Sequence, residues 1–339
     1  HFDQVDMIDL KFIETCVDSD GVQILYGGRP LDDYDCVYCR GSSKYNLILQ
    51  SISEALEGKS YLPLTASSFT TGHNKYLTTL ELQKSKIAQP KSYLASTGGA
   101  AKKILKKIHY PVIIKIPSGT HGKGVMVAES FASASSVLDA LEVFKQPYII
   151  QEFIDTGAED IRAIVVGNRV VAAMKRRAQS GELRANIHAG GDGIPYMLSS
   201  SAENLAIRSA KAIGAEISGV DLLEGAKMNV LEVNLSPGLQ GITKATGKNI
   251  AGKIAQYLHE RTLEYKKTDT NTKYTDILKG IEKKPVTKHS EVIVNLDVKA
   301  GRLKLPMGIT KLSGLKDEDE VLIKVGNRKI LIKDNNEVK

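Results

Sequence analysis

The chain has 339 residues, enough for two or three domains, and its content of 42% hydrophobic and 25% charged residues is that of an ordinary globular protein. Its net charge of +7 is concentrated after residue 265, where 17 lysines and arginines face 11 acidic residues, against 29 and 28 before that point. A strongly basic nucleic-acid-binding body is therefore not indicated, and no apolar run reaches the roughly 18–20 residues that a membrane span needs.

The three cysteines, Cys16, Cys36 and Cys39, are too few for a disulfide framework, which favours a reducing compartment. We therefore expect a cytoplasmic protein with no membrane partner. Cys36 and Cys39 form a C-x-x-C pair in the apolar run LDDYDCVYCR, with no second pair nearby. Because a structural zinc ion needs four ligands, we expect a structural role for the pair, with metal or redox chemistry as the alternative.

Residues 1–70 alternate the apolar runs VDMID, VQILY and CVYC with a helix-like stretch, NLILQSISEALEG. This alternation predicts a first α/β domain at residues 1–70. The opening HFDQVDMIDL reads as the middle of a domain, so we expect a strand and a helix to precede it.

One helix is predicted at residues 72–90, with Leu77, Leu80 and Leu82 on a partly apolar face and Pro90 beyond its end. Further elements up to residue 155 are helices at Gly99–Ile108 and around Ser133–Phe144, and strands at PVIIKIP, VMVAES and PYIIQEFI.

Lys115 lies in the strand PVIIKIP, which runs into a glycine-rich loop, GTHGKG, at residues 119–124. Such a lysine either reaches out to solvent or binds phosphate beside a loop whose bare N–H groups approach oxygen atoms closely. The loop is not a Walker motif, which needs GKS or GKT leading into a helix. Gln151 and Glu152 either end a strand or present backbone groups to an adenine, and Lys75 read alone is a solvated surface residue.

From Asp160 to Lys175 the sequence is almost pure strand, with Gly167-Asn168 as a hairpin turn. The next segment, MKRRAQSGELRANIHAGGDG at residues 174–193, is glycine-rich and basic. Guanidinium groups bind carboxylates and phosphates bidentately, so this segment indicates a site for an anionic substrate or a transferring phosphoryl group, with a solvated loop as the alternative. Its polar side chains are Arg176, Arg177, Arg184, Asn186 and His188, and we expect the histidine to be a hydrogen-bonding loop residue.

A helix is predicted near Ala202–Gly214, followed by two short strands, Gly219–Leu223 and Asn229–Asn234, that a turn at Glu224–Lys227 joins. Because side chains alternate along a strand, Glu232 and Asn234 point one way while Leu231 and Val233 pack on the other side.

If these strands pair as a hairpin, Asp221 shares the face of Glu232 and Asn234. Two carboxylates and one amide carbonyl then converge, and such hard oxygen ligands suit magnesium. The alternative is the polar face of an ordinary surface hairpin.

The rest of the chain predicts a helix at Ile250–Lys266, a Lys/Thr-rich linker at residues 266–290 and a small β domain at residues 291–339. The strands of that last domain are EVIVNLDV, RLKLP, VLIKV and KILIK.

The run from about Lys75 to Ala255 resembles the ATP-grasp superfamily and, within it, the RimK-type α-L-glutamate ligases. The resemblance rests on VIIKIPSGTHGKGV, QEFI, DIRAIVVGNRVVAAMKRRAQSGELRANIHAGG and GVDLL…LEVNLSPGLQGITKATGKNIAGKIA, in the family's order. It implies an α/β fold with an ATP-grasp domain at residues 71–265, made of a nucleotide lobe (71–155) and a catalytic lobe (156–265). Residues 1–70 resemble the pre-ATP-grasp domain that precedes it.

The resemblance also implies roles for individual residues. Those for the nucleotide are Lys75, Lys115, Gly122 and Gly124 at the phosphates, Gln151, Glu152, Phe153 and Ile154 at the adenine edge, Asp160 at the ribose, and Arg184, Ala185 and Asn186 nearby. The remaining roles are Asp221, Glu232 and Asn234 as metal ligands, Arg176 and Arg184 in catalysis, and Arg177, Ser236 and Gly238 at the substrates.

The implied reaction activates a carboxylate as its acyl phosphate with ATP and two Mg2+ or Mn2+ ions. The amine of L-glutamate, or of a similar amino acid, then attacks, and ADP and phosphate are released. The acceptor would be a protein C-terminus or a small coenzyme. An acyl phosphate hydrolyses in water, so the loop at 119–124 is expected to act as a lid.

The tail, VNLDVKAGRLKLPMGITKLSGLKDEDEVLIKVGNRKILIK, resembles AbrB-type swapped-hairpin modules. Such modules dimerise and some bind DNA, so we expect a homo-oligomer, a dimer or a tetramer. The alternative function is a nucleotide-sensing regulator that binds DNA through this module.

Overall fold

The computed structural model describes residues 1–19, 21–117, 124–177 and 192–282, and the strands of the C-terminal region. Two compact units divide the chain, His1–Thr262 and Leu263–Lys339. Within the described residues, no helix combines the length and the apolar character that a membrane crossing requires.

The N-terminal region holds a three-stranded antiparallel sheet and two helices. Its elements are β1 (Ile13–Asp18), β2 (Gly21–Tyr26), β3 (Arg29–Pro30), α1 (Asn46–Leu56) and α2 (Ala66–Gly72), with short 3₁₀ turns η1 (Leu10–Phe12) and η2 (Ser43–Tyr45). The helix predicted in NLILQSISEALEG is confirmed as α1. The run VDMID forms no strand. The run CVYC makes only one isolated bridge, from Cys36 to Tyr61, and is not a strand either.

The cysteines of that run are both free thiols, and Cys39 belongs to the hydrophobic core. Burial raises the pKa of the Cys39 thiol to about 11. A free thiol with so high a pKa is a poor nucleophile, and the burial of Cys39 in the core is consistent with a structural role for it.

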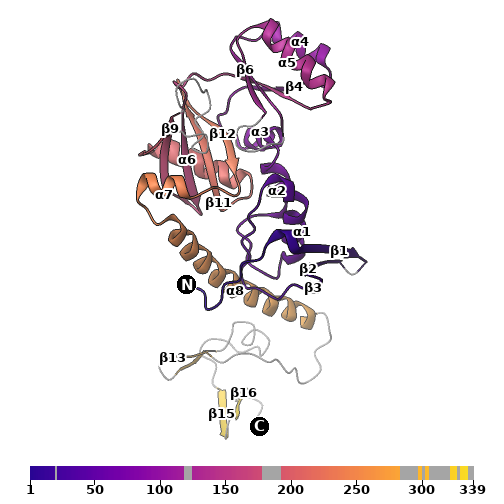
Figure 1. The fold of residues 1–339 in the computed structure, drawn as a ribbon. Helices are drawn as coiled ribbons and strands as arrows, with labels where there is room; N and C mark the ends of the chain where they lie inside the picture. Colours follow the sequence, from indigo (N-terminus) through magenta and orange to yellow (C-terminus); the bar gives the residue numbers. More distant parts are fainter. Residues whose placement is uncertain are drawn as a thin grey trace. The chain divides into compact units, whose positions relative to one another are not determined.

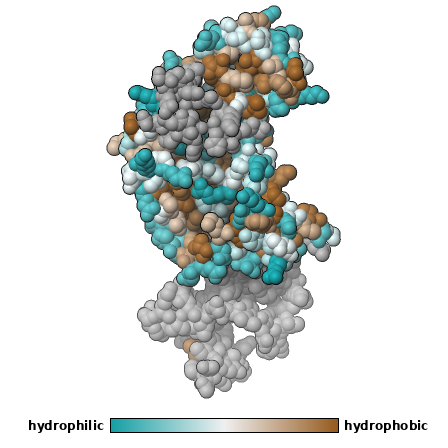
Figure 2. Space-filling model, in the orientation of Figure 1, coloured by the Kyte–Doolittle hydropathy of each residue, from teal (hydrophilic) through white to brown (hydrophobic). Residues whose placement is uncertain are grey.

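A four-stranded antiparallel sheet follows, in the order β4-β7-β5-β6. Its strands are β4 (Ser92–Leu94), β5 (Val112–Lys115), β6 (Val125–Ala128) and β7 (Ile149–Glu152). Two helices, α4 (Gly98–Leu105) and α5 (Phe131–Val143), lie together and bury Leu105 and Leu138 in the core of this lobe (Figure 1). Figure 2 shows apolar residues, in brown, gathered on the visible face of the same lobe.

Helix α3 (Lys75–Lys84) is shorter than the helix predicted at residues 72–90. Its N-cap is Asn74, whose side chain accepts hydrogen bonds from the amides of Tyr76 and Leu77, so the helix begins after residue 72. The predicted apolar face is also wrong in part: Leu82 is buried, whereas Leu77 and Leu80 are exposed.

The second large sheet has five antiparallel strands in the order β10-β9-β8-β11-β12. These are β8 (Glu159–Val166), β9 (Arg169–Arg177), β10 (Asp192–Pro195), β11 (Ile217–Glu224) and β12 (Met228–Asn234). The predicted hairpins are confirmed: β8 turns into β9 at Gly167-Asn168, and β11 turns into β12 after Glu224.

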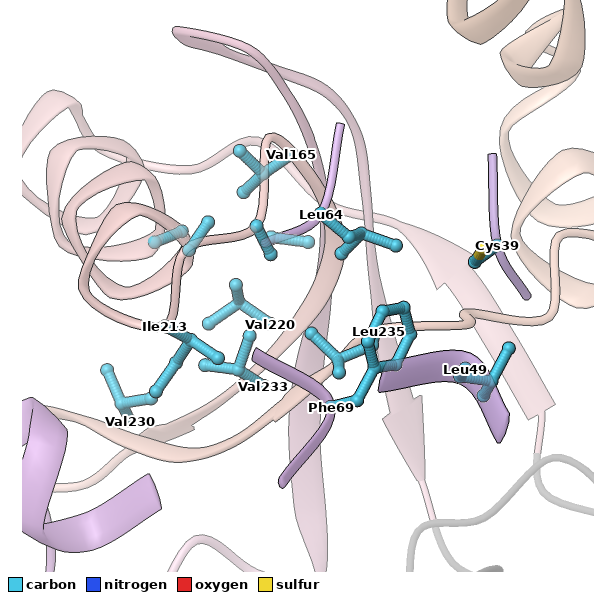
Figure 3. Close-up of a cluster of buried hydrophobic side chains, with 14 of the residues drawn as sticks. Cys39, Leu49, Leu64, Phe69, Val165, Ile213, Val220, Val230, Val233 and Leu235 are labelled. Carbon is cyan, nitrogen blue, oxygen red and sulfur yellow. The ribbon is translucent and has the colours of Figure 1, made fainter. Parts of the chain in front are cut away.

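Helix α6 (Ser200–Ala212) packs across one face of this sheet (Figure 1). Alternate residues of β8, Ile161, Ala163 and Val165, face that side and are buried, as the period of two requires. Figure 3 shows the cluster, in which Val220 and Val233 lie with Phe69 and Leu235. The opposite face carries polar residues such as Asp160 and Arg162 beside buried apolar ones such as Ile164 and Met174.

Helices α7 (Gln240–Thr246) and α8 (Ile250–Glu282) complete the helical part of the chain. Helix α8 continues past Lys266, where its end was predicted. In the C-terminal unit the described strands form two antiparallel pairs, β13 (Asp297–Lys299) with β14 (Arg302–Lys304) and β15 (Val321–Gly326) with β16 (Lys329–Asp334).

Candidate active site

The strand register places a row of charged residues on the face of the five-stranded sheet opposite α6. Asp160 on β8 pairs with Arg176 on β9, and Arg162, two residues further along β8, pairs with Asp221 on β11. Asp221 in turn pairs with Glu232 on β12. Since residues directly opposite each other in a sheet share a face, all five side chains lie on one side. The expected convergence of Asp221 with Glu232 therefore occurs.

A β-bulge changes one detail of that expectation. The register shifts between Asp221 and Leu222, so that Asp221 pairs with Glu232 but Leu222 pairs with Val230. Leu231 is the extra residue: it lines the cavity and lies outside the hydrophobic core, whereas Val230 and Val233 on either side of it both pack in the core with α6. The prediction that Leu231 and Val233 share a side is thus wrong for Leu231.

Asp221 is the centre of a buried network of ion pairs. Arg162 binds it bidentately, with Nε 2.8 Å from Oδ1 and Nη2 2.7 Å from Oδ2. The Nη2 of Arg176 lies 2.9 Å from the same Oδ2, and the Nδ2 of Asn234 donates to it at 3.4 Å. Arg176 also binds Asp160 bidentately, at 2.5 and 2.6 Å.

The electrostatics of the network shift the pKa values of its two aspartates in opposite directions. Burial alone would raise the pKa of Asp221, but the charges of Arg162 and Arg176 outweigh burial and hold its pKa at about 2. Burial and the neighbouring charge of Asp221 raise the pKa of Asp160. Two arginines and two aspartates balance each other, and each guanidinium is bonded to a carboxylate, which makes their burial tolerable.

A second polar chain crosses the four-stranded sheet. The Nζ of Lys115 on β5 donates to Oε1 of Gln151 on β7 at 2.5 Å, and Nε2 of Gln151 donates to Oγ of Ser92 on β4 at 2.8 Å. Lys115 is only 9% exposed, and its burial lowers the pKa of the ammonium to about 8. Lys115 therefore lines the cavity and does not reach out to bulk solvent.

The ion-pair network around Asp221 and the hydrogen bonds from Lys115 through Gln151 to Ser92 border one cavity of about 440 Å³. Its walls come from α3, from the four-stranded sheet and from the polar face of the five-stranded sheet, with the segment after β12. Site residues predicted from the sequence that line it are Lys75, Lys115, Gln151, Glu152, Phe153, Ile154, Asp160, Arg176, Asp221, Glu232, Asn234, Ser236 and Gly238.

Two predicted site residues lie away from the cavity lining. Gly124 has a φ of +77° and accepts a hydrogen bond from the amide of Ile116, which is a turn role. The side chain of Arg177 is 74% exposed and is paired with Glu159, itself a lining residue. The predicted residues Gly122, Arg184, Ala185, Asn186 and His188, and most of the expected lid at 119–124, lie outside the described residues.

The segment Gly41–Ser43, from the N-terminal region, forms another part of the wall. Two contacts tie it to the segment after β12: Nη2 of Arg40 donates to the carbonyl oxygen of Pro237 at 2.6 Å, and the amide of Gly41 donates to Oγ of Ser236 at 2.9 Å. A Cβ at Gly41 would lie 2.9 Å from Cδ1 of Leu10, so a larger residue there would have to displace that side chain.

His73 lines the same cavity, with Nδ1 3.2 Å from the Oδ1 of Asn46 at the start of α1. An amide oxygen only accepts, so Nδ1 carries the hydrogen in this arrangement. Burial lowers the pKa of this imidazole below its usual range, which keeps it neutral near pH 7. Its Nε2 is then the ring nitrogen that can accept a hydrogen bond from a ligand.

Sequence reasoning missed Arg162, His73 and the Gly41–Ser43 segment. For Arg162 a signal existed, because it lies two residues after Asp160 on a strand and must share its face. For Gly41–Ser43 there was none, since only tertiary contacts bring it to residues almost two hundred positions away.

The oxygen set at the cavity fits a divalent hard cation. Among the described residues no three His, Cys, Asp or Glu side chains cluster as metal ligands, but the amide of Asn234 supplements the two carboxylates. Glu232 lines the cavity, and no described residue donates a hydrogen bond to it. Its carboxylate is therefore available to a ligand, whereas that of Asp221 is engaged by two arginines.

Comparison with known proteins agrees with this geometry. Residues 72–258 match a family described as RimK-like ATP-grasp domain. A relative from Aliivibrio fischeri, named probable alpha-L-glutamate ligase, is 35% identical over 274 residues, which is 80% of this chain and 91% of the relative.

Solved structures share the fold at low identity. The ATP-grasp ligase PsnB, in complex with a phosphomimetic variant of a minimal precursor, Mg and ADP, has a TM-score of 0.56 at 16% identity, covering 74% of this chain and 85% of its own. The VanG D-Ala:D-Ser ligase from Enterococcus faecalis has a TM-score of 0.55 at 19% identity, covering 73% and 80%.

Proposed function

The chain belongs to the RimK-like ATP-grasp family and is an ATP-grasp ligase, and we propose that it joins the amine of L-glutamate, or of a similar amino acid, to a carboxylate acceptor. The relatives named probable alpha-L-glutamate ligase support glutamate as the amino acid. The acceptor is a protein C-terminus or a small coenzyme, activated as its acyl phosphate, and the products include ADP and phosphate.

One observation carries this proposal. A single cavity brings two lysines, Lys75 and Lys115, together with the oxygen ligands Asp221, Glu232 and Asn234 and with the guanidinium of Arg176. Phosphoryl transfer to a carboxylate needs such a set, because negative charge must be offset on both the nucleotide and the acceptor.

At the nucleotide end, Lys75 and Lys115 bind phosphate oxygens, and the chain through Gln151 and Ser92 holds the Lys115 ammonium in place. Because the side chain of Gln151 is used in this way, its part at the adenine edge is left to its backbone, together with Glu152, Phe153 and Ile154. Asp160 is bound to Arg176 and also lines the cavity, so its carboxylate can accept a hydrogen bond from a ribose hydroxyl.

Asp221, Glu232 and Asn234 line the cavity and would hold Mg2+ or Mn2+. When bound, the metal supplies charge stabilisation for the transferred phosphoryl group. Arg176, fixed by Asp160 and Asp221, directs its remaining N–H groups at charge developing on the phosphoryl group and on the tetrahedral intermediate.

The acceptor lies against Ser236–Gly238 and the Gly41–Ser43 segment. In the transfer step the amine nitrogen attacks the acyl carbon, the bond from that carbon to the phosphate oxygen breaks, and phosphate leaves with the electron pair. The amine must lose a proton, and a neutral imidazole such as His73 at the cavity wall is a suitable acceptor for it.

We propose for the C-terminal unit a role in assembly, as in the AbrB-type modules it resembles. The DNA-binding alternative gains no support from the comparisons. We also propose domain boundaries near residues 70, 265 and 290.

The test is ADP release with magnesium, glutamate and a panel of carboxylate acceptors, together with the mass of each product. A gain of one or more glutamyl units on one acceptor is the expected result. Tight ATP binding without turnover for any amino acid would overturn the ligase assignment for glutamate.

A further inference from the structure

We propose that Arg162 is an internal counter-ion of Asp221 that must leave this carboxylate when the metal binds, and that it thereby makes metal binding depend on nucleotide. The inference rests on the metal site of the proposed function. It concerns a residue for which neither the motifs nor the comparisons supply a role.

The carboxylate of Asp221 is engaged by donors on both oxygens. Arg162 donates to Oδ1 and to Oδ2, whereas Arg176 and Asn234 donate to Oδ2 alone. Arg162 is therefore the donor that lies against both oxygens. A metal ion that binds either oxygen meets its positive charge, and repulsion between the two cations favours the withdrawal of Arg162.

Arg162 is the donor best able to withdraw. Arg176 is held from its other side by Asp160, at 2.5 and 2.6 Å, and keeps a full partner whether or not it touches Asp221. Among the residues that the structure describes, Arg162 is bonded to Asp221 alone, and it lines the cavity with 16% of its side chain exposed.

The charge balance then sets the order of binding. A metal ion that enters alone displaces Arg162 toward a cavity that already holds the cations Lys75, Lys115 and Arg176. Repulsion between these like charges disfavours that state. When nucleotide is present, its phosphates neutralise the lysines and offer the released guanidinium a bidentate partner. Metal and nucleotide therefore bind cooperatively, and Arg162 is the source of part of that coupling.

The test measures Mn2+ binding by electron paramagnetic resonance, first without nucleotide and then with a non-hydrolysable ATP analogue, so it does not depend on turnover. Couplings between sites are typically about 5–150-fold. We expect wild-type protein to bind Mn2+ weakly alone and at least about tenfold more tightly with the analogue.

In Arg162→Gln, Asp221 keeps Arg176 and Asn234 as donors on Oδ2, so the fold is retained while both hydrogen bonds from the guanidinium of Arg162 are lost. This variant should bind Mn2+ alone about tenfold more tightly than wild type and lose most of the coupling. Arg162→Lys, which keeps the positive charge, should preserve the coupling between Mn2+ and nucleotide. Arg208→Gln is the matched control. Arg208 donates to the carbonyl oxygen of Ser85 on the exposed surface, so this substitution removes the same charge away from the cavity.

Equal Mn2+ affinity in wild type and Arg162→Gln without nucleotide, or an unchanged coupling in the variant, would overturn the role of Arg162. A glutamyl ligase with that result would keep the proposed function and lose only this inference. A different outcome is that the coupling is present in wild type and lost in Arg162→Gln while the protein forms no glutamyl product. That result would keep the inference and overturn the proposed reaction. Wild-type protein that binds no Mn2+ even with the analogue would overturn the metal site and the inference together.

Discussion

Nucleotide affinity should fall above pH 8, because Lys115 loses its charge there. Burial lowers the pKa of this ammonium to about 8, although the carboxylate of Glu232 works in the opposite direction. A group with that pKa is about 90% charged at pH 7 and about 10% charged at pH 9. If phosphate binds only the charged form, the apparent Kd rises about tenfold between these values, equivalent to about 1.4 kcal/mol.

The assay is titration of a non-hydrolysable ATP analogue by calorimetry at intervals from pH 7 to pH 9.5, at constant ionic strength and metal. Lys115→Arg is the control, since a guanidinium stays charged throughout this range and should give a flat profile. A wild-type Kd that stays constant from pH 7 to pH 9, or an equally steep rise in Lys115→Arg, would refute the reasoning.

The ligand-free protein should respond in the opposite direction. An unfolded lysine has a pKa of about 10.4, so between about pH 8 and pH 10.4 the unfolded state binds more protons than the folded state. Stability from this residue therefore rises with pH in that window. The difference in unfolding free energy between wild type and Lys115→Met isolates the contribution, and a difference independent of pH would contradict the buried environment of Lys115.

Three further outcomes are expected. Glu232→Gln should abolish ADP formation while leaving the unfolding transition within about 1 kcal/mol of wild type, because this carboxylate has no described hydrogen-bond donor to lose; retained turnover would remove it from the metal site. Arg176→Ala should lower the free energy of unfolding by about 3–5 kcal/mol in denaturant titrations, since it leaves Asp160 without its described partner, and a stability change below 1 kcal/mol would contradict the buried network. Gly41→Val should raise KM for the acceptor several-fold with an unchanged Kd for the ATP analogue, and an equal loss of both would show that the segment does not act on the acceptor alone.

The hairpin that carries the proposed metal ligands was predictable because one physical rule determines it. Asp221, Glu232 and Asn234 share a face through the alternation of strand side chains, and the glycine-containing turn fixes the pairing. The same rule fails for Leu231, where a bulge inserts one residue. A bulge depends on packing against neighbouring strands and leaves no mark in a single strand's pattern.

Other features could not be predicted because they depend on tertiary contacts. Whether Lys115 faces solvent or a cavity is decided by what covers β5, and the sequence left both readings open. The exposed Leu77 and Leu80 on α3 likewise look like core residues in sequence, although the helix begins at Lys75 and turns them outward. The contact of Arg40 with Pro237 joins two segments with no local signal in either.

That contact has an evolutionary consequence. The segment at Gly41–Ser43 lies before residue 72, where the match to the ATP-grasp family begins, yet it borders the same cavity as Lys75 and Lys115, the proposed phosphate ligands. Under the proposed function, selection can alter acceptor preference by exchanging residues there without changing the strands that carry the proposed ATP-binding residues. We expect paralogues with different acceptors to diverge first in this short stretch, provided that the two hydrogen bonds fastening it to Ser236 and Pro237 are kept.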